Sequence, residues 1–224
     1  ETEAREVELV KGTNIKSLPE FDKLPDDIDV PVLLRVGDDV STDEIMPAGS
    51  RVLPYRSNIP KIAEFTYIQV DETYATRALD FPGGHSIVGG DNYGQGSSRE
   101  HAVIAPRHLG LRVVIAKSFA RIHWQNLANF GVLPLEFAHP EDYDRIGRDD
   151  VIELSGLRDA LQQGNTVTAE LEGDPLELRH RLSDRQVEMV LAGGRIPQRA
   201  AQGTGSESDT TEPHEDIKPA QPEG

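Results

Sequence analysis

The chain has 224 residues, no cysteine and a formal net charge of −16 at pH 7. Its length suits one well-packed domain better than two, and the lack of cysteine excludes disulfides, thiolate nucleophiles and any cysteine-held zinc or iron–sulfur site within this sequence. The acidic balance disfavours nucleic acids and anionic membranes as partners, because binding to either needs clustered Lys and Arg.

The excess of acidic over basic residues is largest at the two ends of the chain. Residues 1–29 carry nine acids and four bases, and residues 201–224 carry six acids and one base. We interpret 1–29 as a linker or N-terminal arm and 198–224 as a disordered acidic tail, with a folded domain over 30–197. No apolar run approaches the roughly 18 residues of a membrane-spanning helix, and the acidic start is unlike a signal peptide. The expected location is therefore cytoplasmic, and because the first residue is Glu1 we also expect an upstream portion.

Between the two ends the apolar segments are short and alternate in kind. The patterns predict strands at 31–36, 86–88, 112–116, 132–137, 151–154, 166–171 and 176–182. They predict helices at 98–109, 120–130 and 183–191, the last capped by Ser183 and Gln186. The strand–helix–strand unit within 86–137 favours a parallel or mixed sheet, and the later strands favour a second β layer. The predicted fold class is α/β.

The glycine-rich segment 89–101, with the sequence GGDNYGQGSSREH, carries the clearest chemical signal. Its glycines let the backbone approach a ligand closely. We predict that Ser97 caps the following helix, with Glu100 completing a capping box. The helix N-terminus and the guanidinium of Arg99 then indicate an anion pocket. A plain helix start is the ordinary alternative, and a phosphate loop is disfavoured because the glycine spacing fits neither common nucleotide motif.

Two other patches are less decisive. Residues 37–45 are rich in acids, but their spacing does not match an EF-hand, so a solvated turn is the default interpretation. Residues 51–60 form an irregular basic loop, where an arginine is more often a surface charge than a ligand clamp. The histidines predict no metal site, since His101 and His108 lie seven residues apart and the others are scattered.

Four patterns together resemble the C-terminal swivel domain of the aconitase superfamily. They are Gly-Asp-x-x-Ser-Thr-Asp-x-Ile at 37–45, Gly-Asp-Asn-Tyr-Gly-x-Gly-Ser-Ser-Arg-Glu-His-Ala at 90–102, Pro-Arg-His-Leu-Gly at 106–110 and Lys-Ser-Phe-Ala-Arg-Ile-His at 117–123. The resemblance covers about 30–197 and implies a swivel-type β/β/α three-layered domain. It also implies a hydro-lyase that interconverts citrate and isocitrate through cis-aconitate, with a 4Fe-4S cluster held by three cysteines. Those cysteines are not in this chain, so the implied partner is a set of cluster-bearing domains or a large subunit, together with a tricarboxylate substrate.

The same resemblance assigns roles to five residues. Ser97 corresponds to the general base that removes a proton next to a substrate carboxylate, and Asp43 to a catalytic, acidic residue of the active site in the Ser-Thr-Asp loop. Ser98 and Arg99 correspond to substrate-binding positions, and Arg56 to the arginine that holds the remote carboxylate. A serine is a weak base at neutral pH, so its alkoxide needs nearby positive charge.

The resemblance leaves three functions open. A C-terminal domain of an aconitate hydratase is favoured because Arg56 suits a third carboxylate better than an isopropyl group. The alternative is the small subunit of a 3-isopropylmalate or homoaconitate dehydratase. A further alternative is a non-catalytic binding module of the same fold. In either enzymatic case we expect this chain alone to be inactive.

Overall fold

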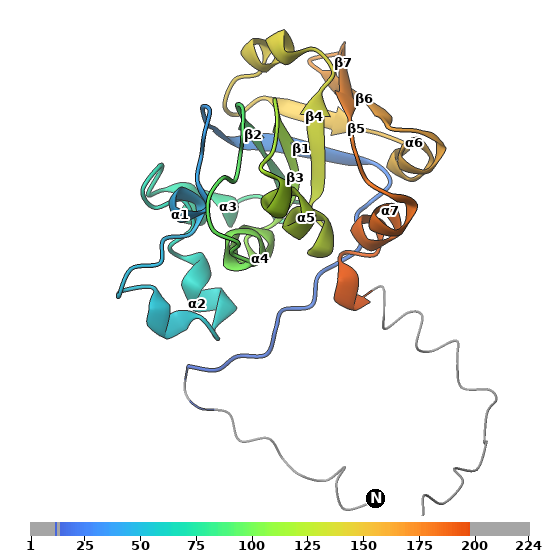
Figure 1. The fold of residues 1–224 in the computed structure, drawn as a ribbon. Helices are drawn as coiled ribbons and strands as arrows, with labels where there is room; N and C mark the ends of the chain where they lie inside the picture. The colour runs from blue at the N-terminus through green and yellow to red at the C-terminus, as the bar shows by residue number, and fades with distance from the viewer. Residues whose placement is uncertain (1–11, 13, 198–224) are drawn as a thin grey trace, which may run out of the picture.

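The computed structural model describes residues 12 and 14–197 (Figure 1). The predicted tail at 198–224, and residues 1–11 and 13 of the predicted arm, lie outside the described residues. Residues 14–27 contain no helix or strand, and the first strand begins at Ile28. The domain limits drawn from the sequence stay a prediction.

The described strands form one closed, mixed sheet. They are β1 Ile28–Arg35, β2 His85–Gly89, β3 Leu111–Ala116, β4 Leu133–Phe137, β5 Val151–Leu154, β6 Thr166–Leu171 and β7 Asp174–Arg179. Their order is β1-β2-β3-β4-β7-β6-β5, with β1 to β4 parallel and the remaining pairs antiparallel. The predicted α/β class with a mixed sheet is confirmed. The two predicted β layers are opposite sides of one barrel, because β1 pairs with both β2 and β5.

Helices cover the outside of this barrel. They are α1 Thr42–Ile45, α2 Ile59–Ala63, α3 Tyr74–Ala78, α4 His101–His108, α5 Arg121–Asn129, α6 Leu157–Gln163 and α7 Asp184–Leu191, with 3-10 helices at Leu53–Tyr55 and Pro140–Arg145. Figure 1 shows α1 to α4 gathered beside the parallel strands, whereas α6 lies beside the antiparallel ones. Among the described residues, no helix combines the length and the apolar composition that a membrane span requires.

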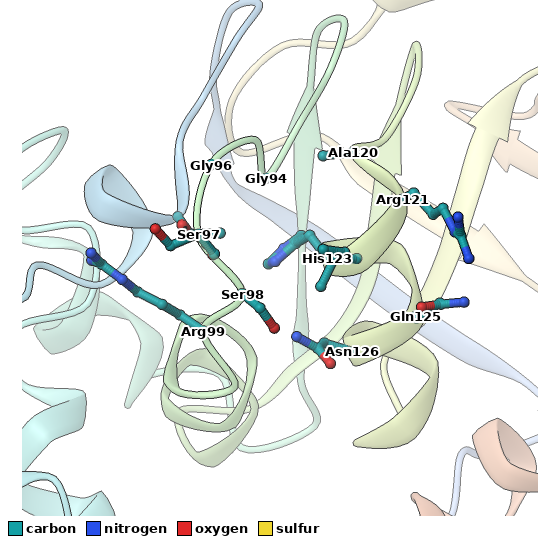
Figure 2. Close-up of a pocket in the computed structure, with 12 residues that line it drawn as sticks. Gly94, Gly96, Ser97, Ser98, Arg99, Ala120, Arg121, His123, Gln125 and Asn126 are labelled. Atoms are coloured by element: carbon teal, nitrogen blue, oxygen red, sulfur yellow. Dashed lines mark hydrogen bonds between the residues drawn. The ribbon is translucent and has the colours of Figure 1, made fainter.

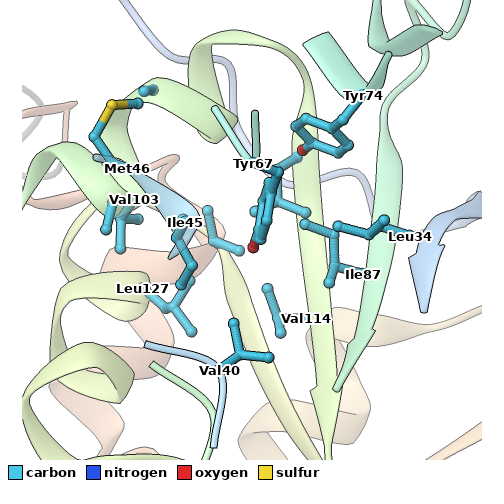
Figure 3. Close-up of a cluster of buried hydrophobic side chains, with 14 of the residues drawn as sticks. Leu34, Val40, Ile45, Met46, Tyr67, Tyr74, Ile87, Val103, Val114 and Leu127 are labelled. Carbon is cyan, nitrogen blue, oxygen red and sulfur yellow. The ribbon is translucent and has the colours of Figure 1, made fainter. Parts of the chain in front are cut away.

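Strand β3 is buried on both faces, which explains its continuous apolar sequence. Val113 and Ile115 belong to the cluster inside the barrel. Val114 lies in a second cluster between the parallel strands and the helices. Figure 3 shows this outer cluster, in which Ile45, Met46 and Tyr67 of the segment after β1 meet Val103 of α4 and Leu127 of α5. The outer cluster therefore fixes the elements that carry the glycine-rich loop.

The predicted helix cap at Ser97 is wrong. Helix α4 begins at His101, and its N-cap is Glu100 without a side-chain cap bond. The Ser97 carbonyl instead accepts a 2.9 Å hydrogen bond from Thr42 Oγ1, which keeps this segment out of the helix. A capping box is present at Ser41 and Glu44 of α1. The predicted box at the start of α7 is confirmed.

Candidate active site

The glycine-rich loop after β2 is held between two neighbouring segments. Gly90 N donates to Gly37 O at 3.0 Å, and Gly94 N donates to Val40 O at 2.7 Å. On the other side, Tyr93 N donates to Ser118 O at 3.0 Å. The loop therefore joins the segment after β1 to the segment after β3, at the carboxyl ends of parallel strands where α/β sheets bind ligands.

Glycine is required at position 94 for two reasons. Its φ is +81°, which side chains rarely adopt, and a Cβ there would overlap the ring of His123. The backbone at Gly94 thus packs directly on α5. The residues that follow Gly94 in the loop therefore lie beside the first turn of that helix.

Arg99 is oriented by two acceptors from the α1 region. Its Nη1 pairs with an Asp43 carboxylate oxygen and donates to the Met46 carbonyl at 3.2 Å. The Arg99 side chain is 23% exposed and that of Asp43 58% exposed. Both bonds come from Nη1, so the Nε–Nη2 edge of the guanidinium is the one suited to grip a ligand carboxylate. The structure thus brings Asp43 and Arg99 together, and Asp43 fixes the orientation of the Arg99 guanidinium.

Arg56 reaches the same neighbourhood from a 3-10 turn. It follows Leu53–Tyr55, and its carbonyl accepts a 2.8 Å hydrogen bond from His101 Nε2 at the start of α4. A cavity of about 360 Å³ lies between this turn and α4. Its lining residues are Met46, Pro47, Ala48, Val52, Leu53, Arg56, Ile62, Ser98, Arg99, Glu100 and His101. Two arginines from distant parts of the sequence therefore line one cavity.

A second cavity, of about 440 Å³, lies on the other side of Ser98 and Arg99, which line both cavities. Its lining residues are Thr42, Gly94, Gly96, Ser97, Ser98, Arg99, Ala120, Arg121, Ile122, His123, Gln125 and Asn126. Figure 2 shows Ser98 pointing towards Asn126, and Arg99 pointing away from α5. Ser97 and Ser98 are exposed, so a ligand can reach both hydroxyls.

The sequence analysis missed the contribution of α5 to this site. His123 and Asn126 are buried and line the cavity that contains Ser97. Burial lowers the pKa of His123 to about 4, so its ring is uncharged at neutral pH. The signal available in the sequence was the position of α5 after a parallel strand, since such helix starts lie beside the loop of the neighbouring strand.

The residues of this chain do not fit an iron–sulfur cluster. The sequence has no cysteine. Within the described part of the chain, no group of three His, Asp or Glu side chains is placed to hold a metal ion. An iron–sulfur cluster of the kind implied by the resemblance could therefore not take cysteine ligands from this chain.

Residues 71–140 match the family described as the aconitase C-terminal domain. The chain is 35% identical over 200 residues to a probable mitochondrial aconitate hydratase of Dictyostelium discoideum, covering 75% of this chain and 25% of that protein. It is 39% identical over 194 residues to a putative mitochondrial aconitate hydratase of Aspergillus fumigatus, covering 74% of this chain and 24% of that protein. The chain thus spans about a quarter of the length of these relatives.

A solved structure shares the fold. It is 3-isopropylmalate dehydratase of Methanocaldococcus jannaschii, with a TM-score of 0.65 and 28% identity over 80% of this chain and 96% of that chain.

The comparisons correct one expectation and establish the family. The cytoplasmic location expected from composition is wrong, since the curated relatives are named mitochondrial proteins. Overall composition did not indicate an organelle, because targeting is encoded in short segments and not in average composition. The matched family, the relatives and the shared fold agree with the four sequence patterns, and the chain belongs to the aconitase superfamily as a C-terminal, swivel-type domain.

Proposed function

We propose that this chain is the C-terminal domain of an aconitate hydratase, a hydro-lyase that isomerises citrate and isocitrate through cis-aconitate. In this proposal Ser97 is the catalytic base, Asp43 contributes to catalysis by orienting the guanidinium of Arg99, and Arg56, Ser98 and Arg99 bind the substrate. The observation that carries the proposal is the meeting of two cavities at Ser98 and Arg99, with Arg56 lining one and Ser97 the other.

Each side chain has a chemical task in this arrangement. The Ser97 oxygen takes the proton from the carbon next to a substrate carboxylate, and the neighbouring Arg99 charge stabilises its alkoxide form. Arg99 binds that carboxylate through its free edge, while Asp43 holds the guanidinium in place. Arg56 binds a carboxylate at the far end of the substrate.

The rest of the enzyme supplies what this chain does not contain. We propose that a 4Fe-4S cluster and its cysteine ligands lie in cluster-bearing domains or in a large subunit, where the cluster would supply Lewis-acid chemistry. Support comes from the fraction of the relatives that this chain covers, about a quarter of their length. This chain alone is expected to fold and to show no hydratase activity.

Replacing Ser97 by Ala in the complete enzyme tests the proposed base. We expect kcat to fall by about 10²–10⁴-fold, the usual contribution of a general base, with KM for citrate little changed. The measurement is the steady-state dehydration of citrate to cis-aconitate. Ser57→Ala is the matched control, because Ser57 is also exposed and lies next to Arg56. Turnover of the Ser97→Ala enzyme within a few-fold of the parent enzyme would remove Ser97 from this role.

The small subunit of a 3-isopropylmalate or homoaconitate dehydratase is the second candidate. It is favoured by the extent of the structural match, which covers 96% of the solved dehydratase chain. The cavity of Arg56 also has an apolar wall, formed by Val52, Leu53 and Ile62, that suits an isopropyl group. Comparing kcat/KM of the complete enzyme for citrate and for 3-isopropylmalate decides between the two candidates.

A further inference from the structure

Within the described residues, the first turn of α5 has backbone N–H groups without hydrogen-bond partners beside the cavity that contains Ser97. Helix α5 has nine residues, and its N-cap, Ala120, has no side chain that can accept a hydrogen bond. The N–H groups of Arg121, Ile122 and His123 precede the first bond of the helix, from Trp124 N to Ala120 O at 3.0 Å. All four residues from Ala120 to His123 line the cavity. The helix dipole adds a partial positive charge at the same place.

Two buried side chains of α5 add polar atoms without partners. Asn126 is 8% exposed and His123 is 2% exposed, and both line this cavity. Within the described residues, neither Asn126 Nδ2 nor His123 Nδ1 has a hydrogen-bond partner. Figure 2 shows the Asn126 amide directed towards Ser98. A buried amide without a partner is costly, and a ligand oxygen placed here would remove that cost.

The charge of the cavity wall selects the ligand. The lining contains Arg99 and Arg121 and no Asp or Glu, in a chain whose net charge is −16. Figure 2 places Arg121 and Gln125 across the cavity from Ser97. A wall of donors and positive charge favours an anion, and the narrow spacing of N–H groups at a helix start suits a carboxylate.

Resting on the proposed function, we propose that the first turn of α5 is a second carboxylate-binding wall of the active site. One carboxylate of the ligand accepts hydrogen bonds from the N–H groups of α5 and from Asn126 Nδ2. A second carboxylate lies on Arg99, which lines both cavities, and a further carboxylate of a tricarboxylate lies on Arg56 in the neighbouring cavity. The ligand class is therefore an acid with at least two separated carboxylates, held across Ser97 and Ser98.

Binding of tricarballylate, a tricarboxylate that has no hydroxyl group to lose, tests this wall on the 224-residue chain. Titration followed by NMR should shift the amide signals of Arg121 and Ile122, and acetate should bind at least about 10-fold more weakly. Asn126→Leu, which keeps the side-chain volume, should raise Kd by about 10-fold, as expected for loss of a hydrogen bond to a charged group. Asn129→Leu is the matched control on the same helix and should leave Kd unchanged.

The Ala120→Asp variant distinguishes a loss of ligand binding from a loss of folding stability. Ala120 already has the extended conformation of an N-cap, with φ −64° and ψ 130°. An aspartate there would cap α5 with its own carboxylate, so thermal stability should be equal or higher while tricarballylate binding falls by 10-fold or more. Unchanged tricarballylate binding by Ala120→Asp and by Asn126→Leu would overturn the proposal.

The test is independent of the proposed catalytic role. In the complete enzyme, Ala120→Asp should raise KM for citrate. If Ser97→Ala abolishes turnover while Ala120→Asp leaves KM unaltered, only the α5 wall is refuted. If the complete enzyme does not turn over citrate at all but the chain still binds tricarballylate at α5, the proposed activity is refuted and the binding wall is kept.

Discussion

At the scale of single residues, the site depends on how closely the glycine-rich loop packs on aromatic side chains. The rings of Tyr93 and His123 lie 5.4 Å apart, and the Tyr93 hydroxyl bonds that of Tyr67 in the buried core. Gly94 follows Tyr93 directly and contacts the His123 ring with its backbone. Buried aromatic rings thus hold the loop on its core-facing side, while its serines are exposed to solvent.

Gly94→Ala should destabilise the protein by about 3 kcal/mol. The cost combines the positive φ at this position with overlap between the new Cβ and the His123 ring. Urea unfolding followed by circular dichroism measures the change. Gly83→Ala is the control, because a Cβ at Gly83 meets nothing within 4 Å, and its effect should stay below about 0.5 kcal/mol. Equal stability of the two variants would contradict this account of the loop.

At the scale of elements, the short helix α1 carries two of the contacts that shape the site. Asp43 orients the Arg99 guanidinium, and Thr42 Oγ1 donates to the Ser97 carbonyl. The capping box of Ser41 and Glu44 stabilises α1 although the helix has only four residues. A helix of this length shows no apolar periodicity, which is why the sequence indicated only a solvated turn at 37–45.

Thr42→Val should lower kcat/KM of the complete enzyme by about 10-fold, because the Ser97 segment loses its contact with α1. The accompanying loss of stability should be about 1 kcal/mol, the worth of one hydrogen bond. Thr66→Val is the matched control, since Thr66 is buried as well and its hydroxyl has no partner within the described residues. A normal kcat/KM for Thr42→Val would show that Ser97 is positioned without α1.

At the scale of the whole molecule, buried histidines tie stability to pH. His85 accepts or donates a 2.7 Å hydrogen bond with the Tyr74 hydroxyl, and burial lowers the pKa of its ring to about 3. Burial lowers the pKa of His123 to about 4. Both folded values lie below the ordinary value near 6.5, so the unfolded chain binds more protons than the folded one as the pH falls.

The free energy of unfolding should therefore be highest above about pH 6.5 and fall as the pH is lowered towards 4. Each of the two histidines should contribute a loss of about 2 kcal/mol between pH 7 and pH 5, at 1.36 kcal/mol per unit of pKa difference. The measurement is urea unfolding at the two pH values. The pKa of Asp71 is also lowered, from an ordinary value of 3.8. Its effect on the free energy of unfolding therefore appears at a pH below this window. A stability that does not change between pH 7 and pH 5 would contradict the burial of these rings.

The strands were predicted more fully than the helices. The limits of β5 and β6 agree with the prediction residue for residue. In both strands apolar and polar residues alternate, and a period of two residues can be recognised within four residues. Helices α2, α3 and α6 were not predicted, since they have five to seven residues and are set by packing rather than by local preference. The start of α4 was placed three residues too early, because Ser97 and Arg99 bond to the α1 region instead of capping α4.

The sequence by itself determined the α/β class, the glycine-rich loop and the family, because these rest on local periodicity and on motifs that are contiguous in the chain. Only the tertiary structure decided that the two β layers close into one barrel, and that Asp43 orients Arg99 across 56 residues. Only the tertiary structure placed Arg56 beside His101, 45 residues away in the sequence. It also showed that residues of α5 line the cavity that contains Ser97. Such contacts depend on how distant segments pack, and no local pattern records which distant segment will be the neighbour.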